Sequence, residues 1–112
     1  MLPKEHRLKR DQDLKSVFTR GGGVSGRFFY LKRYPNQLGV SRFAFVVGSK
    51  VSKSAVLRNK IRRRMREVVR LRLPSVRMGM DIAVVAKPEV RTVSSLDARQ
   101  DLERLLKRAN IL

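Results

Sequence analysis

The sequence predicts an α+β fold, a single-layer sheet of about four strands with three helices in the order α-β-β-β-α-β-α. Apolar residues recur at helical spacing in three segments, and short runs rich in aromatic and β-branched residues lie between them. A strand, a basic helix and a further strand follow one another in the middle of the chain. This succession favours a βαβ crossover between parallel strands, which general rules make right-handed.

Length and composition indicate one domain that works beside a polyanion. The chain has 112 residues, with 27 Lys plus Arg against 9 Asp plus Glu and a formal charge of +18. The hydrophobic share of 42% supports a modest core at this length. Self-repulsion of this size is tolerated mainly beside a polyanion, so nucleic acid is the first candidate partner. We therefore expect residues 1–112 to form one nucleic-acid-binding domain.

A membrane surface is the rival polyanion, and the sequence argues against it. No stretch approaches the roughly 18 consecutive apolar residues of a spanning helix, and the start lacks the apolar region of a signal peptide. We expect a cytoplasmic protein without a membrane partner. The absence of cysteine excludes disulfides, thiolate zinc sites and thiol nucleophiles, in agreement with a reducing compartment.

The N-terminal part begins with a basic segment, residues 1–10, that lacks periodicity and is expected to be a mobile arm. Three apolar residues then recur at helical spacing: Leu14, Val17 and Phe18. They predict a helix from about Asp11 to Arg20, with Asp11 as its N-terminal cap. Gly21–Gly23 end this pattern and predict a flexible connection.

Strands are predicted in the middle and later parts of the chain. Phe28–Tyr34 suits a strand followed by a turn, and a weaker strand is predicted around Leu38–Val40. Ser41–Gly48 is clearer, and because both of its faces are apolar we expect it to be central in the sheet. Asp81–Ala86 reads as another buried strand, and Pro88 stops it.

The stretch from Ser49 to Leu73 predicts a helix with one buried stripe and several basic rows. Its apolar stripe consists of Leu57, Ile61, Met65, Val68 and Leu71. Ten Lys or Arg residues stand in the stretch against one acid, Glu67, and Pro74 requires the helix to end by Leu73. Like charges at i, i+4 repel unless phosphates approach, so this one-sided charge favours nucleic-acid contact over a merely solvated face.

The last segment predicts a third amphipathic helix, capped by Ser94 or Ser95. Its apolar face consists of Ala98, Leu102, Leu105, Leu106 and Ala109. This helix and the basic helix are expected to cover one face of the sheet. The other face would then be a shallow open surface, which is a second candidate binding site.

The chain offers little for catalysis by the protein itself. His6 is the only histidine and lies in the arm, where an ordinary exposed role is expected. Asp81 could contact a cation, while Asp97, Asp101 and Glu103 are expected to be solvated or paired on the last helix. The sequence contains no phosphate-loop, dinucleotide or nucleophile-elbow motif. We expect no protein active site.

The aromatic residues have two interpretations that the sequence leaves open. Several must pack in the core, because the chain has no tryptophan. Single-stranded RNA, however, is commonly held by bases stacked on aromatics within a basic groove, and Lys32 and Arg33 accompany the aromatics of the first strand. The residues concerned are Phe18, Phe28, Phe29, Tyr30 and Tyr34.

The run Ala55-Val56-x-Arg58-Asn59-x-x-Arg62-Arg63-x-x-Arg66-Glu67 is similar to an arginine-asparagine-arginine signature. Supporting residues are Arg7-Leu8-Lys9-Arg10, Asp13, Val17, Phe18, Gly21 and Asp81-Ile82. On these residues, which span nearly the whole chain, the sequence resembles the protein component of bacterial ribonuclease P. The resemblance implies an accessory subunit that helps a catalytic RNA remove the 5′ leader from precursor tRNA. Its implied partners are the RNA subunit and precursor tRNA, with no obligate protein partner.

The resemblance also implies sites, a metal and a topology. The RNA subunit would be bound by Arg58, Asn59, Arg62, Arg63 and Arg66. The leader would lie between the first helix and the sheet, with Leu14, Phe18, Tyr30 and Lys32 as candidates. Magnesium ions held mainly by the RNA would perform the hydrolysis, and the βαβ crossover would be left-handed. Two rival interpretations are a small ribosomal or other structural RNA-binding protein and a stand-alone nuclease.

Two positions depart from the pattern of the family that the chain resembles. Leu14 stands where the family often has an aromatic residue, and the loop from Lys50 to Ser54 has serine where a glycine is usual. The helix motif is intact. The departures therefore concern the predicted leader site and the approach to the basic helix.

Overall fold

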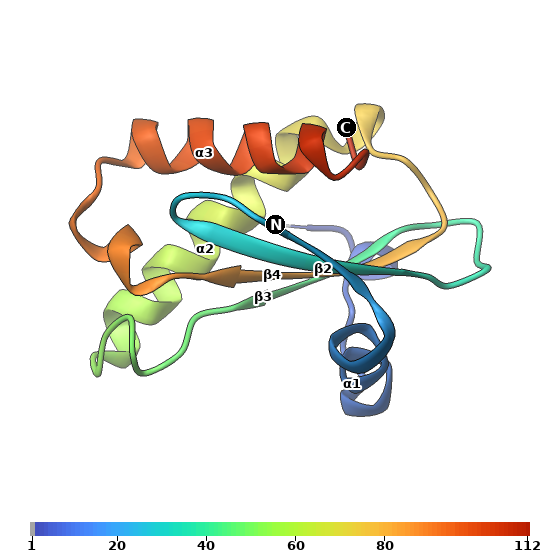
Figure 1. Ribbon diagram of the computed structural model, residues 1–112, viewed down its shortest axis with the longest axis horizontal. Coiled ribbons are helices and arrows are strands. Elements are labelled where there is room, and N and C mark those ends of the chain that lie inside the picture. Colours follow the sequence, from blue (N-terminus) through green and yellow to red (C-terminus); the bar gives the residue numbers. More distant parts are fainter. Residues whose placement is uncertain (1) are drawn as a thin grey trace.

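One four-stranded sheet organises the molecule in the computed structural model, which describes residues 2–112 (Figure 1). The main elements are α1 (Asp11–Arg20), β1 (Gly22–Ser25), β2 (Phe29–Pro35), β3 (Arg42–Val46), α2 (Ala55–Arg72), β4 (Met80–Ala86) and α3 (Ser95–Arg108). Short 3-10 turns are η1 (Lys4–His6), η2 (Leu73–Ser75) and η3 (Pro88–Thr92). The predicted α+β class and the order α-β-β-β-α-β-α are confirmed.

The strands lie in the order β1-β2-β4-β3. β2 pairs antiparallel with β1 and β4, whereas β3 pairs parallel with β4. Figure 1 shows α2 and α3 on one face of the sheet and α1 on the other. When the sheet is viewed from the side of α2 with the parallel strands β3 and β4 pointing upward, β4 lies to the left of β3. The crossover is therefore left-handed, as the resemblance implies and against the general rule.

Two predictions about where the strands lie are wrong. Leu38–Val40 forms a bend, and the additional strand is instead β1, built from the glycine-rich stretch that was expected to be a flexible connection. The buried carboxylate of Asp101 in α3 stabilises the turn after β1, because it accepts hydrogen bonds from the backbone N–H groups of Arg27 at 3.1 Å and Phe28 at 2.9 Å. Asp101 is therefore neither solvated nor part of a surface pair.

The prediction that the strand around Phe43 is central is also wrong. β3 lies at the edge of the sheet, and β4 is the strand with a neighbour on each side. The N-terminal segment covers part of the β3 edge, where Leu8 N–H donates to the Phe43 carbonyl oxygen at 2.8 Å. Because of this pairing, the apolar strand β3 can lie at the edge of the sheet without leaving all of its edge N–H and C=O groups unpaired.

The N-terminal segment packs against the sheet through Leu2 and Leu8, both buried. His6 was expected to be exposed, but it is buried, and its Nδ1 donates to the Ser41 carbonyl oxygen at 2.8 Å. The cause is the η1 turn, which brings the His6 ring against the start of β3. In this position His6 satisfies a backbone acceptor, as a buried polar group must.

The main core lies between the sheet and the helices α2 and α3. From α2 it receives Ile61, Met65, Val68 and Val69, and from α3 it receives Leu102, Leu105 and Leu106. Leu71 was predicted to belong to the buried stripe, yet its side chain is 57% exposed, while Val69 is fully buried. Successive steps of four residues from Ile61 lead through Met65 to Val69, so Leu71 falls on the flank of the stripe.

Two of the three predicted helix-end signals are confirmed, namely the cap at Ser94 and the end of α2 before Pro74. Ser54 caps α2 by accepting from Leu57 N–H at 3.2 Å, and Ser94 caps α3 by accepting from Asp97 N–H at 3.1 Å. α2 ends at Arg72, before Pro74. The prediction for Asp11 is wrong: it is the first helical residue, and Arg10 stands at the cap position without a side-chain cap bond.

Candidate nucleic-acid interface

The basic residues of α2 form two rows beside its buried stripe. The first row consists of Arg58, Arg62 and Arg66, all half-buried because they border the side chains that pack on the sheet. The second row lies farther from the core and includes the exposed Asn59 and Arg63. The structure thus brings all five residues of the predicted RNA-subunit site onto adjoining strips of one helix.

Backbone carbonyl groups hold the first row in place. Arg58 Nη1 donates to the Ser52 carbonyl oxygen at 2.9 Å, and Arg62 Nη1 lies 3.4 Å from the Val47 carbonyl oxygen. Arg62 also donates to the side-chain oxygen of Asn59, one turn earlier in α2. These bonds restrict the guanidinium groups before any ligand arrives, while each retains further N–H donors for a phosphate.

The outer part of the helix carries charge with little compensation from acids. Arg63 is exposed and belongs to no ion pair within the described part of the chain. Farther along, Arg70 donates to both carboxylate oxygens of Glu67, and this partner lowers the pKa of Glu67 below its ordinary value. The only acid of α2 is therefore occupied by its own helix, and the Arg58–Arg66 half keeps its full positive charge.

A shallow hollow before the start of α2 extends this basic surface. It is lined by the loop Ser49–Ser54 and by Arg91 of η3. Lys50 and Lys53 of that loop and Arg91 are exposed. No local pattern connects Arg91 to the basic helix, because Arg91 lies 37 positions after Ser54 and only the crossover brings the two segments together.

The predicted leader site lies on the opposite face of the sheet, where α1 packs. Leu14 and Phe18 are half-buried against a small second core formed by Leu8, Val17 and Ala83. Tyr34 and Ala44 pack on the same cluster. Part of the surface of Leu14 and Phe18 therefore stabilises the fold, and the rest is exposed to solvent.

Tyr30 and Lys32 reach this face from β2. They alternate with the buried Phe29 and Leu31, whose side chains enter the main core on the other face. Lys32 Nζ donates to the Phe18 carbonyl oxygen at the end of α1 at 2.8 Å. The structure thus brings Phe18 and Lys32 into contact and places Tyr30 one pleat farther along the same face.

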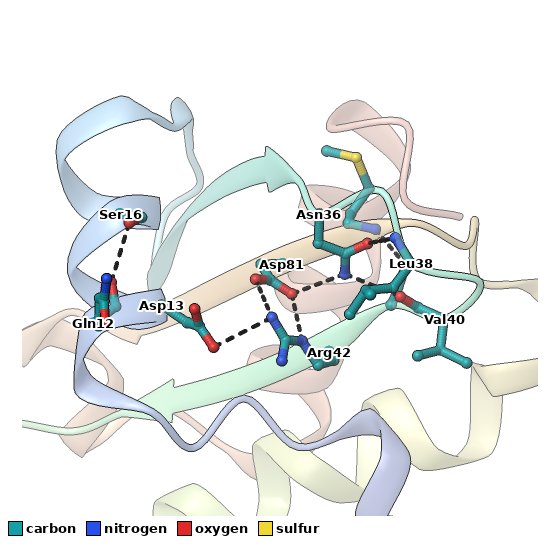
Figure 2. Close-up of polar contacts among 10 residues, drawn as sticks. Gln12, Asp13, Ser16, Asn36, Leu38, Val40, Arg42 and Asp81 are labelled. Carbon is teal, nitrogen blue, oxygen red and sulfur yellow. Dashed lines mark hydrogen bonds and ion pairs between the residues drawn. The ribbon is translucent and has the colours of Figure 1, made fainter.

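Asp81 does contact a cation, and that cation is Arg42 (Figure 2). The Arg42 guanidinium donates to Asp81 Oδ1 at 2.8 Å and Oδ2 at 2.7 Å, and it also lies 3.5 Å from Asp13 Oδ2 in α1. Asn36 donates to Asp81 Oδ1 at 2.9 Å. No local pattern in the sequence marks Arg42 and Asn36, because only strand pairing places them beside Asp81.

The carboxylates and the histidine of the described residues do not gather into a metal-binding group. Over residues 2–112, the structure contains no cluster of three or more His, Cys, Asp or Glu residues that could hold a metal ion. Asp13 and Asp81 lie on either side of Arg42, whose guanidinium binds Asp81 closely and lies 3.5 Å from Asp13. This donor set does not fit a divalent cation.

None of the helices within residues 2–112 is long and apolar enough to cross a membrane.

Known proteins resemble the chain over nearly its whole length. A family model described as Ribonuclease P matches residues 2–110. The ribonuclease P protein component of Picosynechococcus is 34% identical over 110 residues, 98% of this chain and 95% of that protein. That of Acidothermus cellulolyticus is 38% identical over 110 residues, 96% of this chain and 91% of that protein. A mutant RNase P protein of Staphylococcus aureus superposes with a TM-score of 0.91 at 29% identity, covering 97% of this chain and 92% of that one.

Proposed function

Because the chain belongs to the ribonuclease P protein family, it is the protein subunit of a tRNA-processing ribonucleoprotein, and we propose how its two surfaces divide that work. The basic face of α2 binds the catalytic RNA subunit. The surface between α1 and the sheet binds the 5′ leader of precursor tRNA. Since precursor tRNA is made in the cytoplasm of bacteria, the proposal includes a cytoplasmic location.

The single observation that carries this proposal is the one-sided charge of α2. Arg58, Arg62 and Arg66 are held by backbone carbonyl groups or by their own helix, and Arg63 is exposed beside them. Arginine binds phosphate in a bidentate manner and keeps its charge at every accessible pH, so such a face suits the backbone of a folded RNA. Asn59 supplies an amide within the same surface.

The opposite face has the features of a site for unpaired nucleotides. Phe18 and Tyr30 supply aromatic surfaces on which bases can stack, and Lys32 supplies positive charge between them. Leu14 offers an apolar contact in place of a stacking one. The proposal assigns the leader to this face because it combines aromatic and basic groups, whereas α2 contains no aromatic residue.

Hydrolysis in this proposal is the task of the RNA subunit and its bound Mg²⁺. Magnesium would supply a polarised phosphate and an activated water at the cleaved bond. The protein contributes by neutralising phosphates and by orienting the leader. Support comes from the carboxylates of Asp13 and Asp81, which Arg42 occupies, so that they are poor ligands for the metal.

A binding titration tests the division of the two surfaces. The protein is titrated into fluorescently labelled RNA subunit, and separately into the assembled complex with precursor tRNA that carries or lacks its leader. Arg63→Ala is expected to weaken binding to the RNA subunit, and Phe18→Ala to weaken only the leader-dependent part. If Phe18→Ala instead weakens binding to the RNA subunit and Arg63→Ala weakens only the leader-dependent part, the assignment of the two surfaces to the two RNAs is wrong.

A further inference from the structure

α1 is attached to the sheet by apolar packing and by polar contacts from two strands. Besides the small apolar cluster around Val17, two polar contacts within the described residues reach the helix from strands. Lys32 of β2 bonds the Phe18 carbonyl oxygen near the C-terminal end, and Arg42 of β3 approaches Asp13 in the first turn. We infer that the ion pair between Asp13 and Arg42 fixes the position of α1 over the sheet and thereby sets the leader-binding surface. This inference rests on the proposed function.

Arg42 is well placed to hold a helix because it is itself held firmly. Its side chain is 22% exposed and makes a bidentate contact with Asp81, whose side chain is 9% exposed. Asn36 bonds both Asp81 and the Val40 carbonyl oxygen, which joins the β2–β3 turn to the same group (Figure 2). The guanidinium group is therefore held rigidly on the sheet. Its hydrogen bonds to Asp81 also raise the pKa of Arg42 above its ordinary value.

Asp13 connects α1 to the rigidly held guanidinium group of Arg42. Its carboxylate lies 3.5 Å from Arg42 Nη2, and its side chain is 33% exposed. Asp13 and Phe18 are roughly 7.5 Å apart along the helix axis, so a tilt at the Asp13 end displaces the Phe18 ring. With Lys32 holding the other end, the two contacts determine how α1 crosses the sheet face and how wide the leader surface is.

The positions of the two carboxylates allow this role to be separated from folding. Loss of Asp81 would leave a partly buried cation without its main partner, which is strongly destabilising. Loss of the Asp13 charge leaves the Arg42–Asp81–Asn36 group complete and removes only the contact with α1. Asp13 and Arg42 are positioning residues in this account, because neither needs to touch the leader.

The experiment compares Asp13→Asn with Asp11→Asn, a change of the same charge in the same first turn. Asp11 is exposed, and among residues 2–112 it has no ion-pair partner. Affinities of the complete ribonucleoprotein are measured for precursor tRNA with a leader and for tRNA without one, together with thermal melting of the protein. Asp13→Asn is expected to weaken the leader-dependent affinity by about threefold, the size of a part-exposed ion pair. Asp11→Asn should leave it unchanged.

Two further results decide the inference. Asp13→Glu keeps the charge and is expected to restore the leader-dependent affinity, whereas a role in folding alone would appear as equal losses for both kinds of tRNA. Equal leader preference in Asp13→Asn and Asp11→Asn overturns the inference. If the unaltered protein itself shows no preference for leader-bearing tRNA, the proposed function of the α1 face has failed, and the positioning role fails with it.

Discussion

The ammonium group of Lys32 in β2 donates a 2.8 Å hydrogen bond to the Phe18 carbonyl oxygen in α1. This bond joins the two elements that border the proposed leader surface. It also places a positive charge at the C-terminal end of α1, where the helix dipole is negative. Lys32 therefore has a structural role in addition to the charge that it presents to RNA.

Replacement of Lys32 tests both parts of this role. Lys32→Met keeps the aliphatic stem but removes the donor, so we expect the free energy of unfolding to fall by about 1 kcal/mol and leader-bearing tRNA to bind more weakly. Lys15→Met, on the exposed side of α1, is the matched control and should affect neither quantity much. Thermal melting and a binding titration measure the two effects. Unchanged stability in Lys32→Met would contradict the structural role.

The α2 face is tested through the salt dependence of binding. Arg63→Ala removes an exposed charge, so binding to the RNA subunit should weaken and the slope of log K against log salt should shrink by roughly one unit per lost phosphate contact. The melting temperature should hardly change, since the Arg63 side chain is exposed. Arg104→Ala in α3 removes the same charge from another exposed helix face and serves as the control. Equal slope changes for both variants would show that total charge, rather than the α2 face, determines binding.

Gly21 gives a prediction about the fold itself. A Cβ atom at Gly21 would lie 2.3 Å from the Val17 carbonyl oxygen and 2.9 Å from that of Arg33, so α1 could not pass so closely to β2. Gly21→Ala is expected to lower the free energy of unfolding by roughly 1–3 kcal/mol, the usual cost of overpacking. A Cβ atom at Gly22 meets nothing within 4 Å, which makes Gly22→Ala the control. Chemical denaturation measures both, and similar losses in the two variants would refute the steric explanation.

The elements with strong local signals could be predicted from the sequence. Ser94 marks the start of α3 and Pro74 marks the end of α2, because capping and proline geometry depend on near neighbours. The basic rows of α2 were equally accessible, since the spacing of a helix places residues four apart on one side. The five residues of that face therefore lie together as expected.

What the sequence could not provide depends on distant parts of the chain. The glycine-rich β1 became a strand through pairing with β2 and support from Asp101, neither of which leaves a local pattern. His6 is buried because the arm adds to the β3 edge. Arg42 reads as an ordinary surface charge until strand pairing places it beside Asp81. The left-handed crossover likewise came from resemblance, because general rules predict the opposite hand.

The most direct test of the account is cleavage of precursor tRNA at low magnesium concentration. The reaction is followed with the RNA subunit alone, with the protein alone, and with both together, using radiolabelled precursor to quantify the released leader. The account predicts that cleavage is stimulated only in the mixture, because the protein neutralises phosphates and holds the leader while the RNA performs the hydrolysis. Cleavage by the protein alone, or a mixture no faster than the RNA alone, would contradict it.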